Sequence, residues 1–244
     1  MVDMDLAEKA NEILKVESLN GKYQVAIKYL PGSKLFDKVK GKVIYVGCGV
    51  ELSPLFLFEN ASTYIHQDLA DRNLTHALRI LEKNKIITDL RKAYDRGSRR
   101  TLRFRYKSMP KTLIEIHGKE SQGEPFGSEG DVAFNVPKDV KKNLEAVYFF
   151  GTPYPHTIRC IQINLLPHLM TRGLFVGPYP YANGQFEGAD PELLGLSRQE
   201  DTFVKNQSIS KRDIESIIGY SIADYKMYLR HQRTMGYQID PNFR

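Results

Sequence analysis

The feature that most constrains the fold is a short apolar run that ends in a glycine turn. Residues 42–46 read Lys-Val-Ile-Tyr-Val and continue directly into Gly-Cys-Gly at 47–49. A mostly apolar run of this length is typical of a parallel strand covered on both faces. Ser53 and Pro54 follow, and this pair is typical of a helix start, with Ser as N-cap and Pro at the first helical position. The segment therefore predicts a strand, a tight turn and a helix.

An acidic residue follows the next predicted strand. Residues 63–67 have strand character and end at Asp68, which lies 21 positions after Gly47. In cofactor-binding βαβ units an acid about 20 residues after the first glycine holds the ribose hydroxyls. Glycine lets a ligand approach the backbone closely, and a helix N-terminus offers unpaired N–H groups. We therefore expect Gly47, Gly49 and Asp68 to form a cofactor site.

The rest of the chain alternates between helical and strand patterns. Residues 74–94 are mostly helical in pattern, residues 158–170 are helical, and Ser210 can cap a helix that ends at Gly219. Buried-type strands are expected at 146–150 and 174–176. This alternation predicts an α/β fold: a doubly wound, mostly parallel sheet with helices on both faces.

No linker or repeat divides the 244 residues, so we expect one α/β domain over residues 1–244. Within it we expect an N-terminal helical segment at 1–40 and an insertion at 85–130.

No apolar run approaches the roughly 20 residues of a membrane helix, and the N-terminus is acidic rather than signal-like. Two cysteines and six histidines without ligand spacing predict neither a disulfide scaffold nor a metal site, and favour the cytoplasm.

The net charge of +6 favours anionic partners, and the cations concentrate in one stretch. Cations interleaved with stackable rings suit a phosphate backbone and unstacked bases. In the alternative interpretation the stretch is a half-buried strand, because charged residues alternate with Leu102, Phe104 and Tyr106. The arginines that would contact nucleic acid are Arg96, Arg99, Arg100, Arg103 and Arg105.

Several segments together resemble the class I S-adenosylmethionine-dependent methyltransferases. KVIYVGCGVELSP is similar to their first motif and YIHQDLA to their second, where the acid binds the adenosine ribose. LEAVYFFGTPYP, LLPHLMTRGLFVG and DIESIIGYSIADYKMYLR are similar to their later strands and helices, in order, over residues 42–230. The resemblance implies S-adenosylmethionine as cofactor and methyl transfer to an unidentified acceptor, with nucleic acid as one candidate.

Two residues depart from the family pattern. Tyr45 stands where the family usually has an acid, and Glu51 stands where its third glycine falls. Glu51 either supplies the missing carboxylate near the methionine amino group or obstructs the site. In the first case the resemblance implies that the cofactor is bound by Gly47, Gly49, Glu51 and Asp68. A non-catalytic member of the fold that has lost the cofactor is therefore an alternative. A nicotinamide-dependent oxidoreductase is a third, disfavoured because Leu52 occupies the place of the third dinucleotide-binding glycine.

The sequence offers two catalytic candidates beyond the strand that ends near residue 150. Open α/β sheets bind ligands past the carboxyl ends of their strands, which is where Tyr154 and His156 fall. His156 could act as a base, although a loop histidine without a task is the simpler interpretation. Methyl transfer itself needs little beyond alignment of the acceptor with the methyl group.

Overall fold

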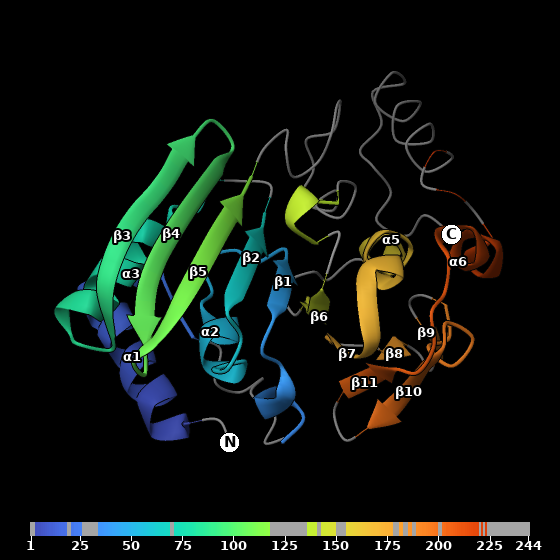
Figure 1. Cartoon of the computed structure of the whole chain (residues 1–244), viewed down its shortest axis with the longest axis horizontal. Helices are drawn as coiled ribbons and strands as arrows, with labels where there is room; N and C mark the ends of the chain where they lie inside the picture. The colour runs from blue at the N-terminus through green and yellow to red at the C-terminus, as the bar shows by residue number, and fades with distance from the viewer. Residues whose placement is uncertain are drawn as a thin grey trace.

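The computed structural model describes residues 3–18, 21–25, 34–68, 71–117, 136–140, 143–149, 155–177, 181–182, 185–186, 189–199, 202–219, 221 and 223. The main feature is a nine-stranded mixed sheet with the order β10-β11-β7-β6-β1-β2-β5-β4-β3 (Figure 1). A separate two-stranded hairpin joins β8 (Tyr181–Ala182) to β9 (Gln185–Phe186).

The five central strands run parallel. They are β1 (Lys42–Val46), β2 (Thr63–Gln67), β5 (Met109–Ile116), β6 (Leu144–Tyr148) and β7 (Leu169–Val176). The chain builds outward from β1 to β2 and β5, and then returns to the other side of β1 to form β6 and β7. The order of the strands thus reverses between β1 and β6, and open α/β sheets bind ligands at such a point.

Antiparallel strands extend the sheet on both sides. β3 (Ile87–Arg96) and β4 (Arg99–Tyr106) form a hairpin beside β5, and β10 (Leu196–Gln199) and β11 (Thr202–Lys205) form another beside β7. Four of the eight pairings in the sheet are therefore antiparallel. The expected doubly wound, mostly parallel sheet is wrong.

One segment accounts for much of this error. The sequence pattern predicts mostly helix over residues 74–94, but α3 ends at Lys83 and β3 begins at Ile87. Lys85 has a positive φ of 60°, which turns the chain back toward the sheet. β3 is an edge strand exposed over most of its length, so it lacks the alternation of polar and apolar residues that marks a half-buried strand.

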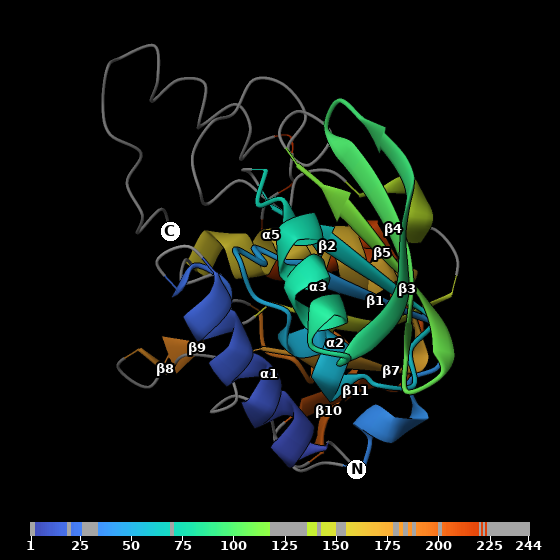
Figure 2. The same ribbon diagram turned by 90° about the vertical axis from the view of Figure 1, so that its left-hand side faces the viewer.

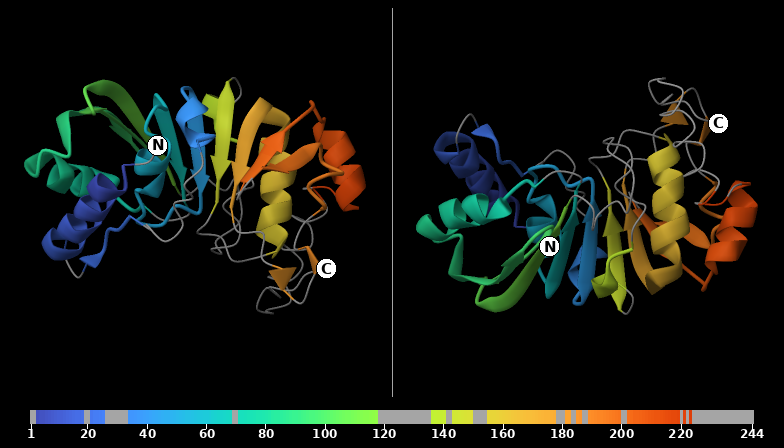
Figure 3. Two further views of the ribbon diagram at one scale, coloured as in Figure 1. Left: turned by 90° about the horizontal axis from the view of Figure 1, so that it is seen from below. Right: turned by 90° about the horizontal axis from the view of Figure 1, so that it is seen from above.

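Two hydrophobic cores lie on opposite faces of the sheet, because neighbouring residues of a strand point to opposite faces. One contains Tyr45 and side chains of α1 (Met4–Glu17), α2 (Ser53–Leu57) and α3 (Leu74–Lys83). The other contains Ile44 and side chains of α5 (Pro155–Leu165) and α6 (Lys211–Ile218). Seen along the strands, α1 and α3 lie toward the β3–β4 end, and α5 and α6 toward the β10–β11 end (Figure 3).

Local sequence explains several element boundaries. Ser210 and Asp213 form a reciprocal capping box at the start of α6, and Gly219 ends it with φ 88°, as expected. Helix α2 begins at Ser53, so Leu52 and not Ser53 is its N-cap. Short 3₁₀ turns occur at Phe36–Lys38 (η3), Lys138–Val140 (η5) and Leu166–His168 (η6). None of the described helices is both long and apolar enough to cross a bilayer.

Candidate functional site

The glycine turn and the acid predicted to face it are in direct contact. The N–H of Gly49 donates a hydrogen bond to Asp68 Oδ2 at 2.7 Å, across the carboxyl ends of β1 and β2. Gly47 and Gly49 both have positive φ, at 64° and 52°. A Cβ added at Gly49 would meet no atom within 4 Å, so the backbone here faces open space. The turn therefore exposes a bare stretch of backbone beside a carboxylate.

Neighbouring groups fix the orientation of the Asp68 carboxylate. Arg72 Nε donates to its Oδ1 at 3.1 Å, and Cys48 Sγ lies 4.0 Å from Oδ2. The hydroxyl of Tyr23 donates to the backbone carbonyl of Asn73 at 3.1 Å, tying the following loop to the N-terminal segment. Asp68 is only 6% exposed.

Burial, followed by the negative charge of Asp68, raises the pKa of the Cys48 thiol well above its usual value, which disfavours a nucleophilic role.

Glu51 does not present its carboxylate to the open side of the turn. The hydroxyl of Tyr45 donates a hydrogen bond to Glu51 Oε2, and Ser53 Oγ lies 3.4 Å from Oε1. Both Tyr45 and Glu51 are buried. Burial and the adjacent Glu51 carboxylate raise the pKa of Tyr45 well above its usual value, so the phenol remains a donor. Tyr45 and Glu51 therefore form one buried pair.

Polar side chains form a row across the sheet on the face that carries α1 and α3. The strand register pairs Tyr45 with Tyr148 on β6 and with His66 on β2. It then pairs His66 with Glu115 on β5, and Glu115 with Arg100 on β4. Paired residues of neighbouring strands share a face, so these side chains lie side by side. The Tyr45 ring indeed packs edge-on against the rings of His66 and Tyr148.

The charged end of this row is an ion-pair network in which Arg100 and Glu115 are buried and Asp71 is exposed. Arg100 Nη1 donates to Glu115 Oε2 at 2.9 Å, and its two Nη atoms reach the two oxygens of Asp71 at 3.2 Å. Glu115 also accepts the N–H of Leu74, the first residue of α3, at 2.8 Å. Although burial disfavours the charge of Arg100, its hydrogen bonds to Asp71 and Glu115 outweigh this effect and raise its pKa.

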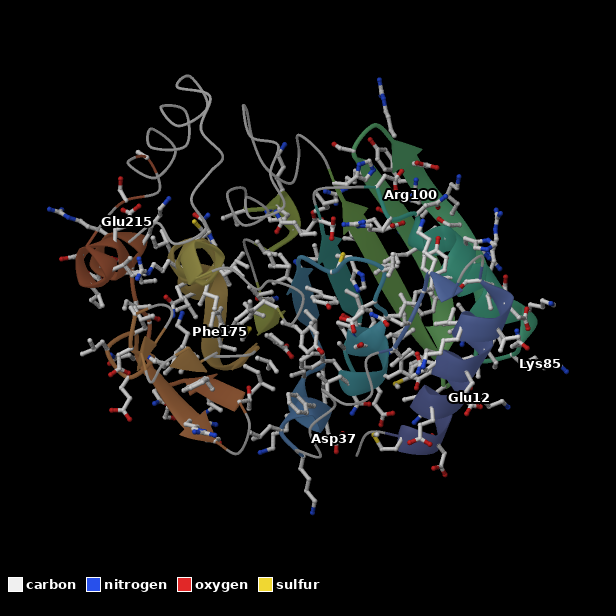
Figure 4. The ribbon with its side chains drawn as sticks, turned by 180° about the vertical axis from the view of Figure 1, so that it is seen from behind. Glu12, Asp37, Lys85, Arg100, Phe175 and Glu215 are labelled. Carbon is white, nitrogen blue, oxygen red and sulfur yellow. The ribbon has the colours of Figure 1, made fainter. Side chains whose placement is uncertain are left out.

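This network corrects the role expected for Arg100. The sequence groups Arg100 with the arginines that would contact nucleic acid, but its side chain is 10% exposed and paired with acids of this chain. Seen from behind, it lies where the β3–β4 hairpin approaches α3 (Figure 4). Arg100 therefore joins the hairpin to the sheet and to α3, and is not available to an external phosphate.

A small cavity lies beside Asp68. It measures about 10 Å³ and is lined by Cys48, His66, Asp68, Arg72, Glu115, Ile116 and His117. Such a volume accommodates about one water molecule.

Burial lowers the pKa of His66 to about 3, so its ring is neutral, and its Nδ1 has no hydrogen-bond partner among the described residues. Within the same part of the chain, no group of three or more His, Cys, Asp or Glu could hold a metal ion.

A larger cavity, of about 550 Å³, lies away from the glycine turn. Its lining residues come mainly from η3 and from the first half of β7, including Lys38, Met170 and Arg172. These segments lie at the amino ends of the parallel strands. This cavity is therefore separate from the predicted cofactor site.

The two catalytic candidates cannot be located as side chains. Tyr154 lies outside the described residues, and His156 falls in α5 with its side chain outside them.

The remaining predicted arginines lie on the β3–β4 hairpin. There Arg103 and Arg105 are exposed and alternate with buried Leu102, Phe104 and Tyr106. The interpretation of residues 101–107 as a half-buried strand is thus confirmed for the part that β4 covers.

Sequence reasoning missed the residues that surround Asp68. Arg72, Glu115 and His66 were not proposed for the site, yet all three line the cavity beside it. A usable signal existed for two of them: His66 and Glu115 are polar residues within otherwise apolar strand runs. Buried polar groups usually have a specific reason to be there.

Comparison with known proteins does not assign the chain to a group. No model of a known protein family matches it, and no curated protein matches it either.

Proposed function

We propose that this protein binds S-adenosylmethionine at the glycine turn and transfers its methyl group to an acceptor. The observation that carries the proposal is the contact between Gly49 and Asp68, with the N–H of Gly49 2.7 Å from the carboxylate. It brings a bare backbone turn and an acid together at the point where the strand order reverses. The sequence resemblance in the same two segments supplies the identity of the cofactor.

In this proposal Asp68 would hold the ribose hydroxyls of the cofactor, as an acid does after the second strand of a βαβ unit. Asp68 is held in place by Gly49 and Arg72, so its carboxylate is already oriented at the end of β2. The cavity beside Asp68 has room for about one water, so the cofactor would lie over the turn, where Gly49 faces open space. The bound cofactor would supply an activated methyl group, and the protein would align the acceptor with it.

Glu51 does not fit the role of binding the methionine amino group. Its carboxylate is buried beneath the turn and accepts a hydrogen bond from Tyr45. We therefore assign Gly47, Gly49 and Asp68 to the cofactor and leave Glu51 out of the site.

A second candidate function follows from the buried pair of Tyr45 and Glu51. The hydroxyl of Tyr45 donates to the carboxylate of Glu51, so this buried pair needs no hydrogen bond from a ligand. This favours the alternative of a non-catalytic protein that binds a partner and no cofactor.

Calorimetric titration of the whole protein with S-adenosylmethionine separates the two candidates. The proposal expects saturable binding that weakens at least tenfold in Asp68→Asn, the loss of one charge-assisted contact. Asp139→Asn is the matched control, since Asp139 forms an ion pair with Arg99 away from the turn. Thermal unfolding establishes that both variants fold. Absence of binding to the parent protein would exclude this site and support the second candidate. Binding that Asp68→Asn leaves intact would exclude this site and contradict both candidates.

Catalysis needs a separate measurement. Transfer of a labelled methyl group from the cofactor to RNA, DNA or protein would show which acceptor is used. Binding without transfer to any of the three would retain the cofactor site and remove the enzymatic part of the proposal.

A further inference from the structure

The strand register divides the side chains of the β3–β4 hairpin between two faces. On β4, Leu102, Phe104 and Tyr106 are buried against α1 and α3, so the residues between them point the opposite way. Across the hairpin, Arg91 pairs with Arg103, Tyr94 with Thr101, and Arg96 with Arg99. We call this second face the outer face; it carries Arg91, Tyr94, Arg96, Arg99, Arg103 and Arg105.

The outer face contains arginines directly opposite one another. Arg91 lies opposite Arg103 and Arg96 opposite Arg99, and like charges in such positions destabilise a sheet. Arg99 is balanced by Asp139 at 2.7 Å. Arg91, Arg96 and Arg103 form no ion pair with any residue in the described part of the chain. The hairpin therefore carries positive charge that the described structure leaves unneutralised.

An exposed aromatic ring lies between the two arginine pairs. Tyr94 is 46% exposed and falls between Arg91 and Arg96 along β3. The ring is thus flanked by cations on both sides along the strand. Exposed aromatic rings within a basic surface are the platforms on which unstacked bases bind.

The outer face is also open among the described elements. The helices α1 and α3 cover the opposite face of the hairpin (Figure 2), and no described helix lies in front of β3 and β4 (Figure 1). Apolar residues are absent from its central positions, so its composition differs from that of a surface that packs against a protein core.

We infer that the outer face of the β3–β4 hairpin binds single-stranded nucleic acid. The unpaired arginines would contact phosphates, and Tyr94 would stack on a base, which a single strand can present and a duplex cannot. The binding itself is independent of the proposed cofactor. Only the further step, that the bound strand is the methyl acceptor, depends on the proposed function.

Fluorescence anisotropy with short labelled RNA and DNA strands and the matching duplex tests this inference without any cofactor. We expect salt-sensitive binding that favours the single strands. In the double variant Arg91→Gln/Arg103→Gln the affinity should fall about tenfold, and the slope of log affinity against log salt should decrease by about 1.4, or about 0.7 for each lost cation. Tyr94→Ser should weaken binding about tenfold with an unchanged salt slope, whereas Tyr94→Phe should bind like the parent protein.

The matched control removes the same charge from the other side of the molecule. Lys9 and Lys15 are exposed on α1, so Lys9→Gln/Lys15→Gln should leave the affinity nearly unchanged. An equal loss in this control, or no binding by the parent protein, would overturn the inference. The arginines would then serve to protect the edge strand β3 from pairing with other chains. Loss of cofactor binding in calorimetry would leave the inference intact, so the two proposals can fail separately.

Discussion

The hydroxyl of Tyr45 donates a hydrogen bond to the carboxylate of Glu51 beneath the glycine turn. Ser53 Oγ lies 3.4 Å from the other oxygen of this carboxylate, so Glu51 joins a residue of β1 to a residue of α2. Because Tyr45 and Glu51 are both buried, removing either one alone should destabilise the protein.

Tyr45→Phe should destabilise the protein by about 1–3 kcal/mol, since it removes a donor from the buried Glu51 carboxylate. Tyr94→Phe is the control, because Tyr94 is exposed on the β3–β4 hairpin. Urea unfolding of both variants gives the comparison. Replacing both partners, as in Tyr45→Phe/Glu51→Leu, should restore part of the loss. Equal stability of Tyr45→Phe and the parent protein would contradict a structural role for this pair.

Arg100→Met should cost about 3–5 kcal/mol, because it leaves the buried carboxylate of Glu115 without its cation. Arg103→Met changes the same residue type on the same strand but on the exposed face, and should stay within about 0.5 kcal/mol of the parent protein. Chemical unfolding of the two variants measures the difference. Similar losses would mean that the buried network contributes no more than an ordinary surface charge.

The elements that sequence predicts best are those whose signals are local. The apolar runs at 42–46 and 63–67 coincide with β1 and β2, because buried central strands are apolar throughout. Ser210 caps the N-terminus of α6 and Gly219 ends the helix, as expected. Both signals depend only on the conformation of a few adjacent residues. The spacing of Gly47 and Asp68 also anticipated that the two strand ends would meet.

What sequence could not supply is the pairing of distant strands. The edge strand β3 has polar residues on both faces, so its hydrogen bonds to β4 determine its conformation against the local pattern. Likewise His66, Glu115 and Arg100 become neighbours only through the register of three strands. The alternation along β4 places Arg100 on the buried face and Arg103 on the exposed one.

His66 should make stability depend on pH. Burial lowers its pKa from 6.5 to about 3, so between these values the unfolded chain binds a proton that the folded chain does not. The free energy of unfolding should therefore fall as the pH is lowered through this range, by up to about 1.4 kcal/mol per pH unit from this group. Urea unfolding at pH 7.5 and at pH 5 measures the effect. In His66→Gln the difference between the two pH values should be smaller; an unchanged difference would assign the effect to other groups.

Lys205→Met tests a buried cation outside the candidate site. The ammonium of Lys205 donates to the carbonyls of Leu166 and Leu169, at 2.5 and 2.6 Å, and the residue is 1% exposed. Methionine fills most of the same volume but leaves both carbonyls without this donor, so we expect a loss of about 2–4 kcal/mol in unfolding free energy. Lys211→Met is the control, since Lys211 is half exposed at the start of α6. If both variants unfold at the same urea concentration, the Lys205 contacts do not hold the turn between α5 and β7.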